Sequence, residues 1–359
     1  MTLFSELLQV ALGQRNKLSR VPSDDEWAAL FAEAKRQAVL GILFCGVEQL
    51  PESQGPPEAV LMRWIAFASK IEARNAKWDQ RSLLLQQKLS DIGLRTTILK
   101  GQGVARLYGT MANRRQNGDI DVFVDGGMEL VESKIPREKV RKWGYKHADL
   151  KLWSDTEVEV HYRVEHMYSH WRDWRLQKWF DSHKEELFHR DGEWVTPTLE
   201  MNLFYLLLHI YRHFFYSGVG LRQIIDYYFC LKKYSESMSN EFTGYALAAV
   251  KSFGMERFAR GLMWVMGETL AMPREWMPWT PDEREGRFIL AQVLAGGNFG
   301  HHGKGSSRPR SRMDKKISIL RHKLHLFRHY PAETIASPFW SFYNKVRESK
   351  YEKRNKNNQ

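Results

Sequence analysis

The chain has few cysteines and no long uninterrupted apolar run. Its 359 residues include two cysteines, Cys45 and Cys230, too few for a disulfide framework, so we expect a reducing compartment, the cytoplasm. The most apolar stretch, residues 201–216, contains three ionisable side chains, whereas a membrane-spanning helix needs about 20 mostly apolar residues. Glu6 interrupts the first apolar segment, so we expect no secretory signal. These observations argue against a disulfide-rich secreted domain and against a membrane span.

The composition is ordinary for a globular protein, but its positive charge is unevenly distributed. Hydrophobic residues make up 43% and charged residues 27% of the chain, and its length suits two or three domains. The net charge is +12, and residues 301–359 alone contribute +11. On composition, such a basic segment is most simply a solvated extension that aids solubility. The other interpretation is a surface that attracts nucleic acid, acidic lipid or a polyanionic substrate.

The first 94 residues are predicted to be helical. Ser23 and Glu26 have the spacing of a capping box at a helix N-terminus. A long helix is predicted from Glu58 to Ser90, ending near Gly93. No internal repeat is evident.

A different pattern, with strands and helices in alternation, covers residues 95–165. Strands are predicted at residues 96–99 and 119–124, a helix at 128–143, and a hairpin from residues 145–153 and 157–164. From residue 172 onward the pattern is again helical, with a last helix near 317–327.

We therefore predict an α+β fold in which a small mixed sheet lies between helical regions. The expected divisions are an N-terminal helical region, an α/β core, a C-terminal helical domain and a basic tail, at residues 1–94, 95–165, 166–300 and 301–359.

Two aspartates provide the strongest chemical signal. Asp119 and Asp121 alternate along one predicted strand, so their side chains project from the same face. Paired carboxylates are costly there unless they bind a cation or contact water, and Mg²⁺ is bound by a few carboxylates together with phosphate oxygens. A second strand places Glu157, Glu159 and His161 on one face beside them. A third carboxylate is what a two-metal site for phosphoryl or nucleotidyl transfer requires.

Upstream, the predicted strand at residues 96–99 is followed by Lys100 and Gly101. Glycine at this position allows the backbone to approach a triphosphate closely, and the lysine neutralises part of its charge. The segment is not a dinucleotide-binding fingerprint, because the third glycine is missing.

These segments together resemble a known family. The similar residues are Leu99-Lys100-Gly101, then Arg115-x-x-Gly118-Asp119-Ile120-Asp121, then Glu159-Val160-His161. They are similar to the uncharacterised nucleotidyltransferase family of the polymerase-β-like superfamily. The match is specific over residues 96–163, and the helical part resembles the family more loosely at residues 217–222 and Asp226.

The resemblance implies a role for each matching residue. Asp119 and Asp121 would hold the metals, Glu159 would supply the third carboxylate, and Gly101 would pack against the nucleotide phosphates. The chain departs from the superfamily pattern where Lys100-Gly101-Gln102 replaces a Gly-Ser pair, and where the gap from Gly101 to Asp119 is longer than usual. This departure bears on the phosphate contact rather than on the metal ligands.

Other polar residues have two interpretations each. Arg115 either contacts phosphate or is a solvated loop residue, and Gly118 directly precedes the aspartates. Arg222 and Asp226 share a helix face, where they form an ion pair or contact the base or the acceptor.

His209 and His213 have the i, i+4 spacing of zinc ligands. No glutamate follows His209 as in the metalloprotease pattern, and the helix is otherwise aromatic. Histidines of the core or of a cleft edge are therefore the favoured interpretation.

The favoured function is a metal-dependent nucleotidyltransferase that uses Mg²⁺ or Mn²⁺. It would transfer a nucleoside monophosphate from an NTP, with ATP among the candidates, to a small molecule, a protein or RNA. The alternative is an inactive or non-transferase protein that binds RNA or nucleotide on the same fold. Three clustered carboxylates favour the enzyme, and the basic segment mildly favours the alternative. A phosphotransferase on the same scaffold cannot be separated from the first function by sequence.

Overall fold

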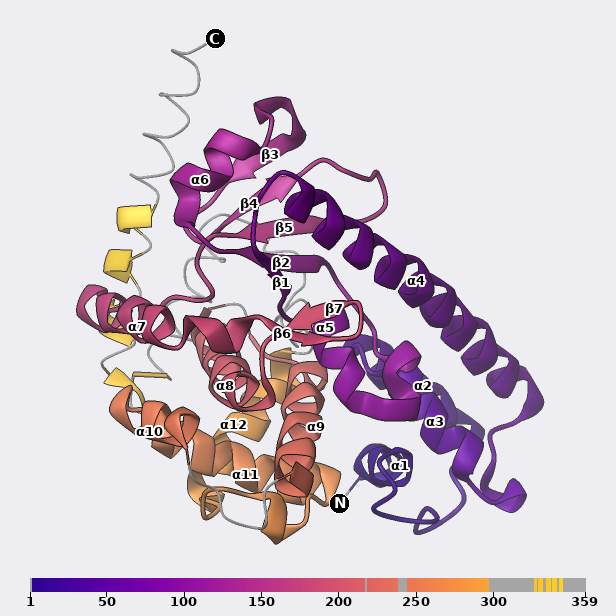
Figure 1. The fold of residues 1–359 in the computed structure, drawn as a ribbon. Coiled ribbons are helices and arrows are strands. Elements are labelled where there is room, and N and C mark those ends of the chain that lie inside the picture. The colour runs from indigo at the N-terminus through magenta and orange to yellow at the C-terminus, as the bar shows by residue number, and fades with distance from the viewer. Residues whose placement is uncertain are drawn as a thin grey trace, which may run out of the picture. The chain divides into compact units, whose positions relative to one another are not determined.

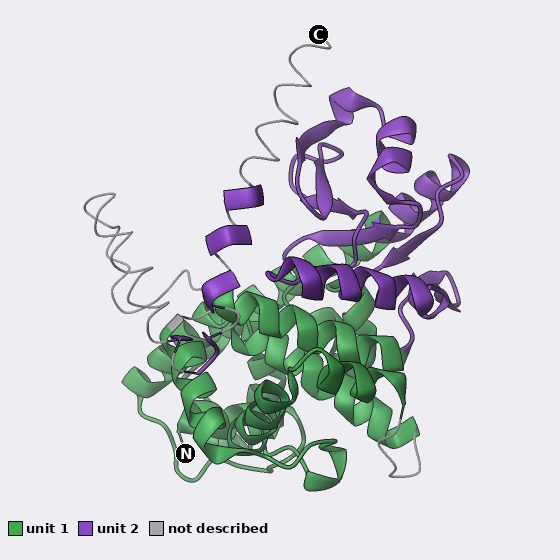
Figure 2. Cartoon of the chain, turned by 90° about the vertical axis from the view of Figure 1, so that its left-hand side faces the viewer, with its two compact units in different colours: residues 1–81, 100–117, 199–304 green, residues 82–99, 118–198, 305–359 purple. Residues whose placement is uncertain are grey.

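The chain forms two compact units, which Figure 2 distinguishes by colour. Unit 1 comprises residues 1–81, 100–117 and 199–304, and unit 2 comprises residues 82–99, 118–198 and 305–359. Each unit is therefore assembled from segments that are separate in the sequence. The computed structural model describes residues 2–216, 218–237, 244–296, 326–327, 329–331, 334–336, 338–340 and 342–344.

The N-terminal part of unit 1 is helical, as the sequence predicts. Its elements are α1 (Leu3–Ala11), α2 (Asp24–Arg36), α3 (Leu40–Gln49), η1 (Glu52–Gln54) and the first part of α4 (Glu58–Asp91). The capping box at α2 is confirmed: the Ser23 hydroxyl accepts a hydrogen bond from the Glu26 N–H, and the Glu26 carboxylate accepts one from the Ser23 N–H. The long helix is also confirmed, with its end at Asp91.

The remaining elements of unit 1 come from two later segments. They are α5 (Gln102–Ala105), η2 (Arg106–Arg114), α8 (Leu199–Tyr216), α9 (Leu221–Ser237), α10 (Tyr245–Ser252), α11 (Glu256–Leu270), η5 (Arg274–Trp276) and α12 (Glu283–Gly296). Helix α1 packs against α11, where the Gln9 amide donates to the carbonyl of Thr269 over 3.4 Å. The first and the last parts of unit 1 thus share one packed interior.

Unit 2 is built around a five-stranded mixed sheet (Figure 1). Its strands are β1 (Thr96–Ile98), β2 (Ile120–Val124), β3 (Val140–Trp143), β4 (His147–Leu150) and β5 (Val158–His161), in the order β1-β2-β5-β4-β3. The central pair β2–β5 is parallel, and the other pairs are antiparallel. This small mixed sheet together with helical regions confirms the α+β class.

Alternation along the strands separates an apolar face from a polar one. Ile120, Val122 and Val124 of β2 belong to one buried apolar cluster. The same cluster includes Leu85 and Leu89 from the end of α4, together with residues of β4, β5 and α6 (Gly127–Lys134). Because successive side chains point to opposite faces, the intervening polar residues of β2, β5 and β4 share the other face.

The sequence prediction was wrong at two places in unit 2. The helix predicted to run to Trp143 ends at Lys134, and Val140–Trp143 is the edge strand β3. Pro136 lies between the two elements and explains why the helix stops. The residue before a proline is biased away from helical conformation, and a proline interrupts helix hydrogen bonding. A short turn, η3 (Arg137–Lys139), connects them.

The second correction concerns a hairpin in the region predicted to be helical. After α7 (His170–Ser182) and η4 (Lys184–Leu187), strands β6 (His189–Asp191) and β7 (Trp194–Thr196) pair antiparallel. The turn contains Gly192 at φ +61°, a conformation that glycine adopts without strain. The Asp191-Gly192 pair is a recognised hairpin signal that the helical interpretation overlooked.

Within the described ranges, none of the helices combines the length and the apolar character that crossing a bilayer demands. Most of the basic segment after residue 300 lies outside the described residues, and so does the helix predicted near 317–327 except for residues 326–327.

Candidate metal centre

The polar face of the sheet in unit 2 brings three carboxylates together. Backbone hydrogen bonds hold β2 on both sides, from the Leu99 N–H to the Asp121 carbonyl and from the Ile120 N–H to the Glu157 carbonyl, each 2.9 Å long. In the parallel pair, Asp121 lies directly opposite Glu159. Asp119 immediately precedes the strand. The sheet register therefore determines which glutamate faces the aspartates.

Asp119, Asp121 and Glu159 each offer a ligand oxygen, and the three oxygens lie within 4.8 Å of one another. Asp121 is almost fully buried, with 1% of its surface exposed. Glu157, by contrast, has a side chain that is 68% exposed and lies 3.8 Å from Arg141. Gathered carboxylates repel one another unless a cation or proton lies among them. An all-oxygen set of this kind fits a hard divalent ion such as Mg²⁺.

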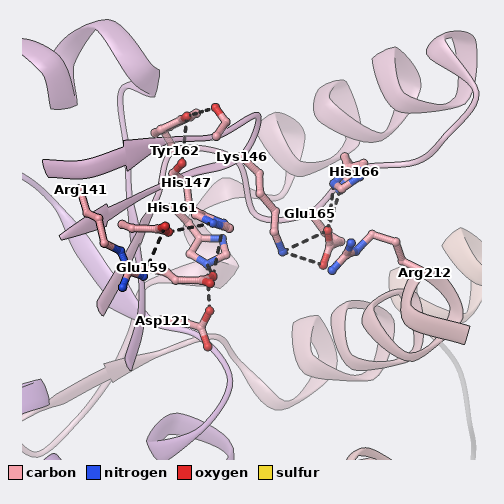
Figure 3. Close-up of polar contacts among 12 residues, drawn as sticks. Asp121, Arg141, Lys146, His147, Glu159, His161, Tyr162, Glu165, His166 and Arg212 are labelled. Carbon is pink, nitrogen blue, oxygen red and sulfur yellow. Dashed lines mark hydrogen bonds and ion pairs between the residues drawn. The ribbon is translucent and has the colours of Figure 1, made fainter. Parts of the chain in front are cut away.

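Two imidazoles adjoin the carboxylates (Figure 3). His161 is fully buried, and its Nε2 lies 2.9 Å from Asp121 Oδ1 and 3.1 Å from Glu159 Oε2. His147 lies directly opposite His161 in the β4–β5 pair. Its Nε2 lies 3.2 Å from Asp149 Oδ1, and its Nδ1 lies 3.3 Å from Glu159 Oε2. Burial lowers the pKa of His147, against the opposing effect of Asp149. The face thus offers nitrogen as well as oxygen ligands.

Of these neighbours, the sequence analysis identified His161 but missed His147 and Asp149. A signal for both was present, since they alternate within the predicted hairpin segment 145–153. The predicted hairpin with residues 157–164 is confirmed by the antiparallel pairing of β4 with β5.

The residues predicted to bind phosphate are divided between the two units. Lys100 and Gly101 begin the second segment of unit 1 and precede α5, whereas Gly118 opens the second segment of unit 2 and directly precedes Asp119. Gly101 has φ +54° and ψ −115°. A residue with a side chain would be strained in this backbone conformation. The backbone conformation by itself therefore explains why residue 101 is glycine.

Arg115 and Asp226 form a buried ion pair in unit 1. Their side chains are 5% and 7% exposed. The carboxylate of Asp226 accepts hydrogen bonds from Arg115 Nε and Nη2 over 2.6 and 2.7 Å, and from the Tyr108 hydroxyl over 2.6 Å. Burial opposes the charge of Arg115, but Asp226 outweighs it and raises the Arg115 pKa. Arg115 also donates to Asn117. The pair therefore holds residues 115–117, immediately before the aspartates in sequence.

Arg222 contacts the same short loop. Its Nη1 donates to the Gln116 carbonyl over 2.8 Å. Asp226 is paired with Arg115, a partner that the sequence analysis did not propose for this side chain.

His209 and His213 lie one helical turn apart on α8, with ring centroids separated by 4.3 Å. His209 is buried, and His213 Nε2 lies 2.7 Å from Arg212. Within the described ranges, neither histidine belongs to a group with metal-ligand spacing.

Comparison with known families addresses the identity of the chain. The family model described as uncharacterised nucleotidyltransferase matches residues 23–271. The chain belongs to this family. The matched range includes Lys100 and Gly101, the three carboxylates and the Arg115–Asp226 pair, and so extends well beyond the segment that carried the sequence resemblance. A search of curated proteins and a search of solved structures each found no match.

Proposed function

We propose that this family member is a metal-dependent nucleotidyltransferase that transfers a nucleoside monophosphate from an NTP to an acceptor. The observation that carries the proposal is the group formed by Asp119, Asp121 and Glu159 on one sheet face, with ligand oxygens within 4.8 Å. Family membership supports the reaction class. The donor set supports Mg²⁺, or Mn²⁺, as the cofactor.

Each carboxylate has a role that follows from its position. Asp121 is buried and held by strand hydrogen bonds on both sides of β2, so it gives a fixed ligand oxygen. Asp119 precedes the strand, and Glu159 reaches the group from β5. Bound divalent ions supply neutralisation of triphosphate charge and orientation of the acceptor oxygen. The protein contributes mainly positioning, since this chemistry asks little covalent work of its side chains.

For the nucleotide we propose Lys100 and Gly101 as phosphate contacts, on the basis of the family resemblance. Gly118, which directly precedes Asp119 in the sequence, is a further candidate for a nucleotide contact. Arg115, Arg222 and Asp226 were predicted as nucleotide contacts, but their buried mutual contacts favour a role in positioning residues 115–117. The acceptor belongs to one of three classes, a small molecule, a protein or RNA.

Calorimetry with Asp119→Asn tests the metal centre. The wild type is expected to bind NTP in the presence of Mg²⁺ and to lose most of that affinity with a chelator. Asp119→Asn is expected to weaken NTP binding by about tenfold or more, since a ligand oxygen loses its charge. Asp125→Asn is the matched control, because Asp125 follows the same strand but pairs with Lys184 at 3.0 Å.

Incubation with labelled NTP and a cell extract then tests transfer. Label should move to an acceptor with the wild type and with Asp125→Asn, and transfer should fail with Asp119→Asn. NTP binding that is indifferent to metal and to Asp119→Asn would show that the metal centre is misassigned.

A further inference from the structure

A second group with metal-ligand spacing adjoins the three carboxylates. His147, Glu159 and His161 each offer one ligand atom, and these atoms lie within 4.8 Å of one another. The residues come from adjacent strands of one sheet, because β4 and β5 pair with His147 opposite His161. Figure 3 shows both imidazoles directed toward Glu159. The group shares Glu159 with the carboxylate group but has two nitrogen donors in addition.

The surroundings of His147 point to a cation at its Nδ1. A neutral imidazole carries one N–H, so one ring nitrogen donates and the other presents a lone pair. Both nitrogens face carboxylates, with Nε2 3.2 Å from Asp149 and Nδ1 3.3 Å from Glu159. When Nε2–H donates to Asp149, the Nδ1 lone pair and the nearby Glu159 oxygen are both electron-rich and repel each other. A cation bound by both atoms would remove this repulsion. A carboxylate that orients a metal-binding histidine is a recurrent arrangement in metal sites.

Both distances from Glu159 to the imidazoles agree with tetrahedral coordination. Two ligands on a Zn²⁺ ion with bonds of about 2.0–2.1 Å lie roughly 3.3 Å apart. Glu159 Oε2 lies 3.3 Å from His147 Nδ1 and 3.1 Å from His161 Nε2. His161 is fully buried, and its Nε2 already lies within hydrogen-bond distance of both Asp121 and Glu159. Two histidines and one glutamate form a known catalytic zinc ligand set, which leaves one position open.

We propose that His147, His161 and Glu159 form a site for a first-row transition ion of the Zn²⁺ class, beside the Mg²⁺ ligands Asp119 and Asp121. Imidazole favours Zn²⁺ and its neighbours in the series, whereas an all-carboxylate set favours Mg²⁺. Asp121, 2.9 Å from His161 Nε2, and the shared Glu159 are placed to bridge the two positions. The centre is then mixed, with one nitrogen-containing and one all-oxygen position. The inference rests on the proposed function only for the Mg²⁺ position.

Titration with Co²⁺ alone tests the site, since Co²⁺ occupies zinc sites and is visible by absorption. The full chain is used without a polyhistidine tag, without nucleotide and with Mg²⁺ in excess. We expect the bands of four-coordinate Co²⁺ to saturate at one ion per chain, to persist in Mg²⁺ and to disappear when Zn²⁺ is added. Absence of such bands, or their loss to Mg²⁺, overturns the proposal.

Three variants assign the ligands. His147→Gln is expected to lower Co²⁺ affinity at least about tenfold, and Asp149→Asn by about 10–100-fold through the orienting hydrogen bond. His189→Gln is the matched control, since His189 is exposed on β6 in the same unit and should bind Co²⁺ as the wild type does. His161→Gln removes a fully buried ring, so it is interpreted only where circular dichroism shows a native fold. Wild-type Co²⁺ affinity and spectrum in His147→Gln overturn the proposal.

Failure of this inference is distinguishable from failure of the proposed function. Asp119 belongs to the carboxylate group but not to the group of His147, Glu159 and His161. Asp119→Asn should therefore retain the Co²⁺ spectrum. If Co²⁺ binds through His147 but no NTP is consumed, the transferase proposal fails and the transition-ion site stands. If Mg²⁺-dependent transfer occurs and His147→Gln does not alter Co²⁺ binding, the transition-ion site fails alone.

Discussion

The Arg115–Asp226 pair allows a quantitative test of whether these residues stabilise the fold. Asp226→Asn removes the negative charge and keeps the shape, leaving the Arg115 guanidinium buried without its counter-ion. Both side chains are less than a tenth exposed, so water cannot compensate. Removing one partner of a buried pair costs about 3–5 kcal/mol. At about 2–4 °C per kcal/mol for a large domain, the midpoint of thermal unfolding should fall by roughly 6–20 °C.

Differential scanning calorimetry measures this midpoint, and an exposed pair on the same unit provides the control. Arg287 and Glu283 are 68% and 62% exposed on α12, at 2.7 Å. Glu283→Gln should therefore change stability by about 0–1 kcal/mol. A further variant, Arg115→Met with Asp226→Leu and Tyr108→Phe, removes the charges and the dependent hydroxyl together. It should recover most of the loss, because apolar replacement of a whole buried pair is often nearly neutral.

Two outcomes would refute this reasoning. If Asp226→Asn melts like Glu283→Gln, the pair is not a structural ion pair of the expected strength. If Asp226→Asn keeps the wild-type midpoint but binds NTP more weakly, Asp226 contacts the nucleotide, as the sequence resemblance suggested.

Two further predictions concern packing and pH. Gly41→Ala should lower the unfolding midpoint through a cost of about 1–3 kcal/mol, because a Cβ there would lie 2.1 Å from the Arg114 carbonyl oxygen. Gly267→Ala, which meets only the end of Met277 at 3.3 Å, should be tolerated, and equal melting of the two variants would contradict the close approach. Burial raises the pKa of Asp79 to about 6, so the folded state retains a proton there that the unfolded state releases, and stability falls as pH rises from about 4 to 6. Asp79→Asn should therefore melt higher than wild type at pH 7 and equally at pH 4, and a constant difference across this range would refute the assignment.

The residues that were predictable from sequence are those whose pattern is local. Alternation placed Asp121 and Glu159 on polar faces of their strands, and the spacing of Ser23 and Glu26 predicted a cap that the structure contains. The end of α6 at Lys134 was missed because helical periodicity was extended past Pro136. Local signals identify elements, but the short connection around a proline decides where one element ends.

The mixed character of the centre was beyond sequence for a different reason. The hairpin that pairs β4 with β5 was predicted, but the approach of His147 to Glu159 depends on the register that sets His147 opposite His161. A shift of one residue would turn His147 toward the apolar cluster. The partner of Asp226 was hidden similarly, since Arg115 is 111 residues away in sequence. Such pairings depend on tertiary contacts that no single segment encodes.

The interleaving of the two units has a consequence for biosynthesis. Helix α1 packs against both α3 and α11, and α11 is made about 260 residues later than α1. At roughly 5–20 residues per second, the part of α1 that contacts α11 stays uncovered for on the order of 10–50 seconds, whereas α3 is made soon after α1. Meanwhile the five-stranded sheet of unit 2 is synthesised between the two, since its last strand in the chain, β5, precedes α8. The nascent chain can therefore complete its metal-binding sheet while the helical unit is still unfinished. Chaperone demand and sensitivity to growth temperature should accordingly fall on the helices, and a truncated chain ending near residue 198 would contain the centre but lack about half of unit 1.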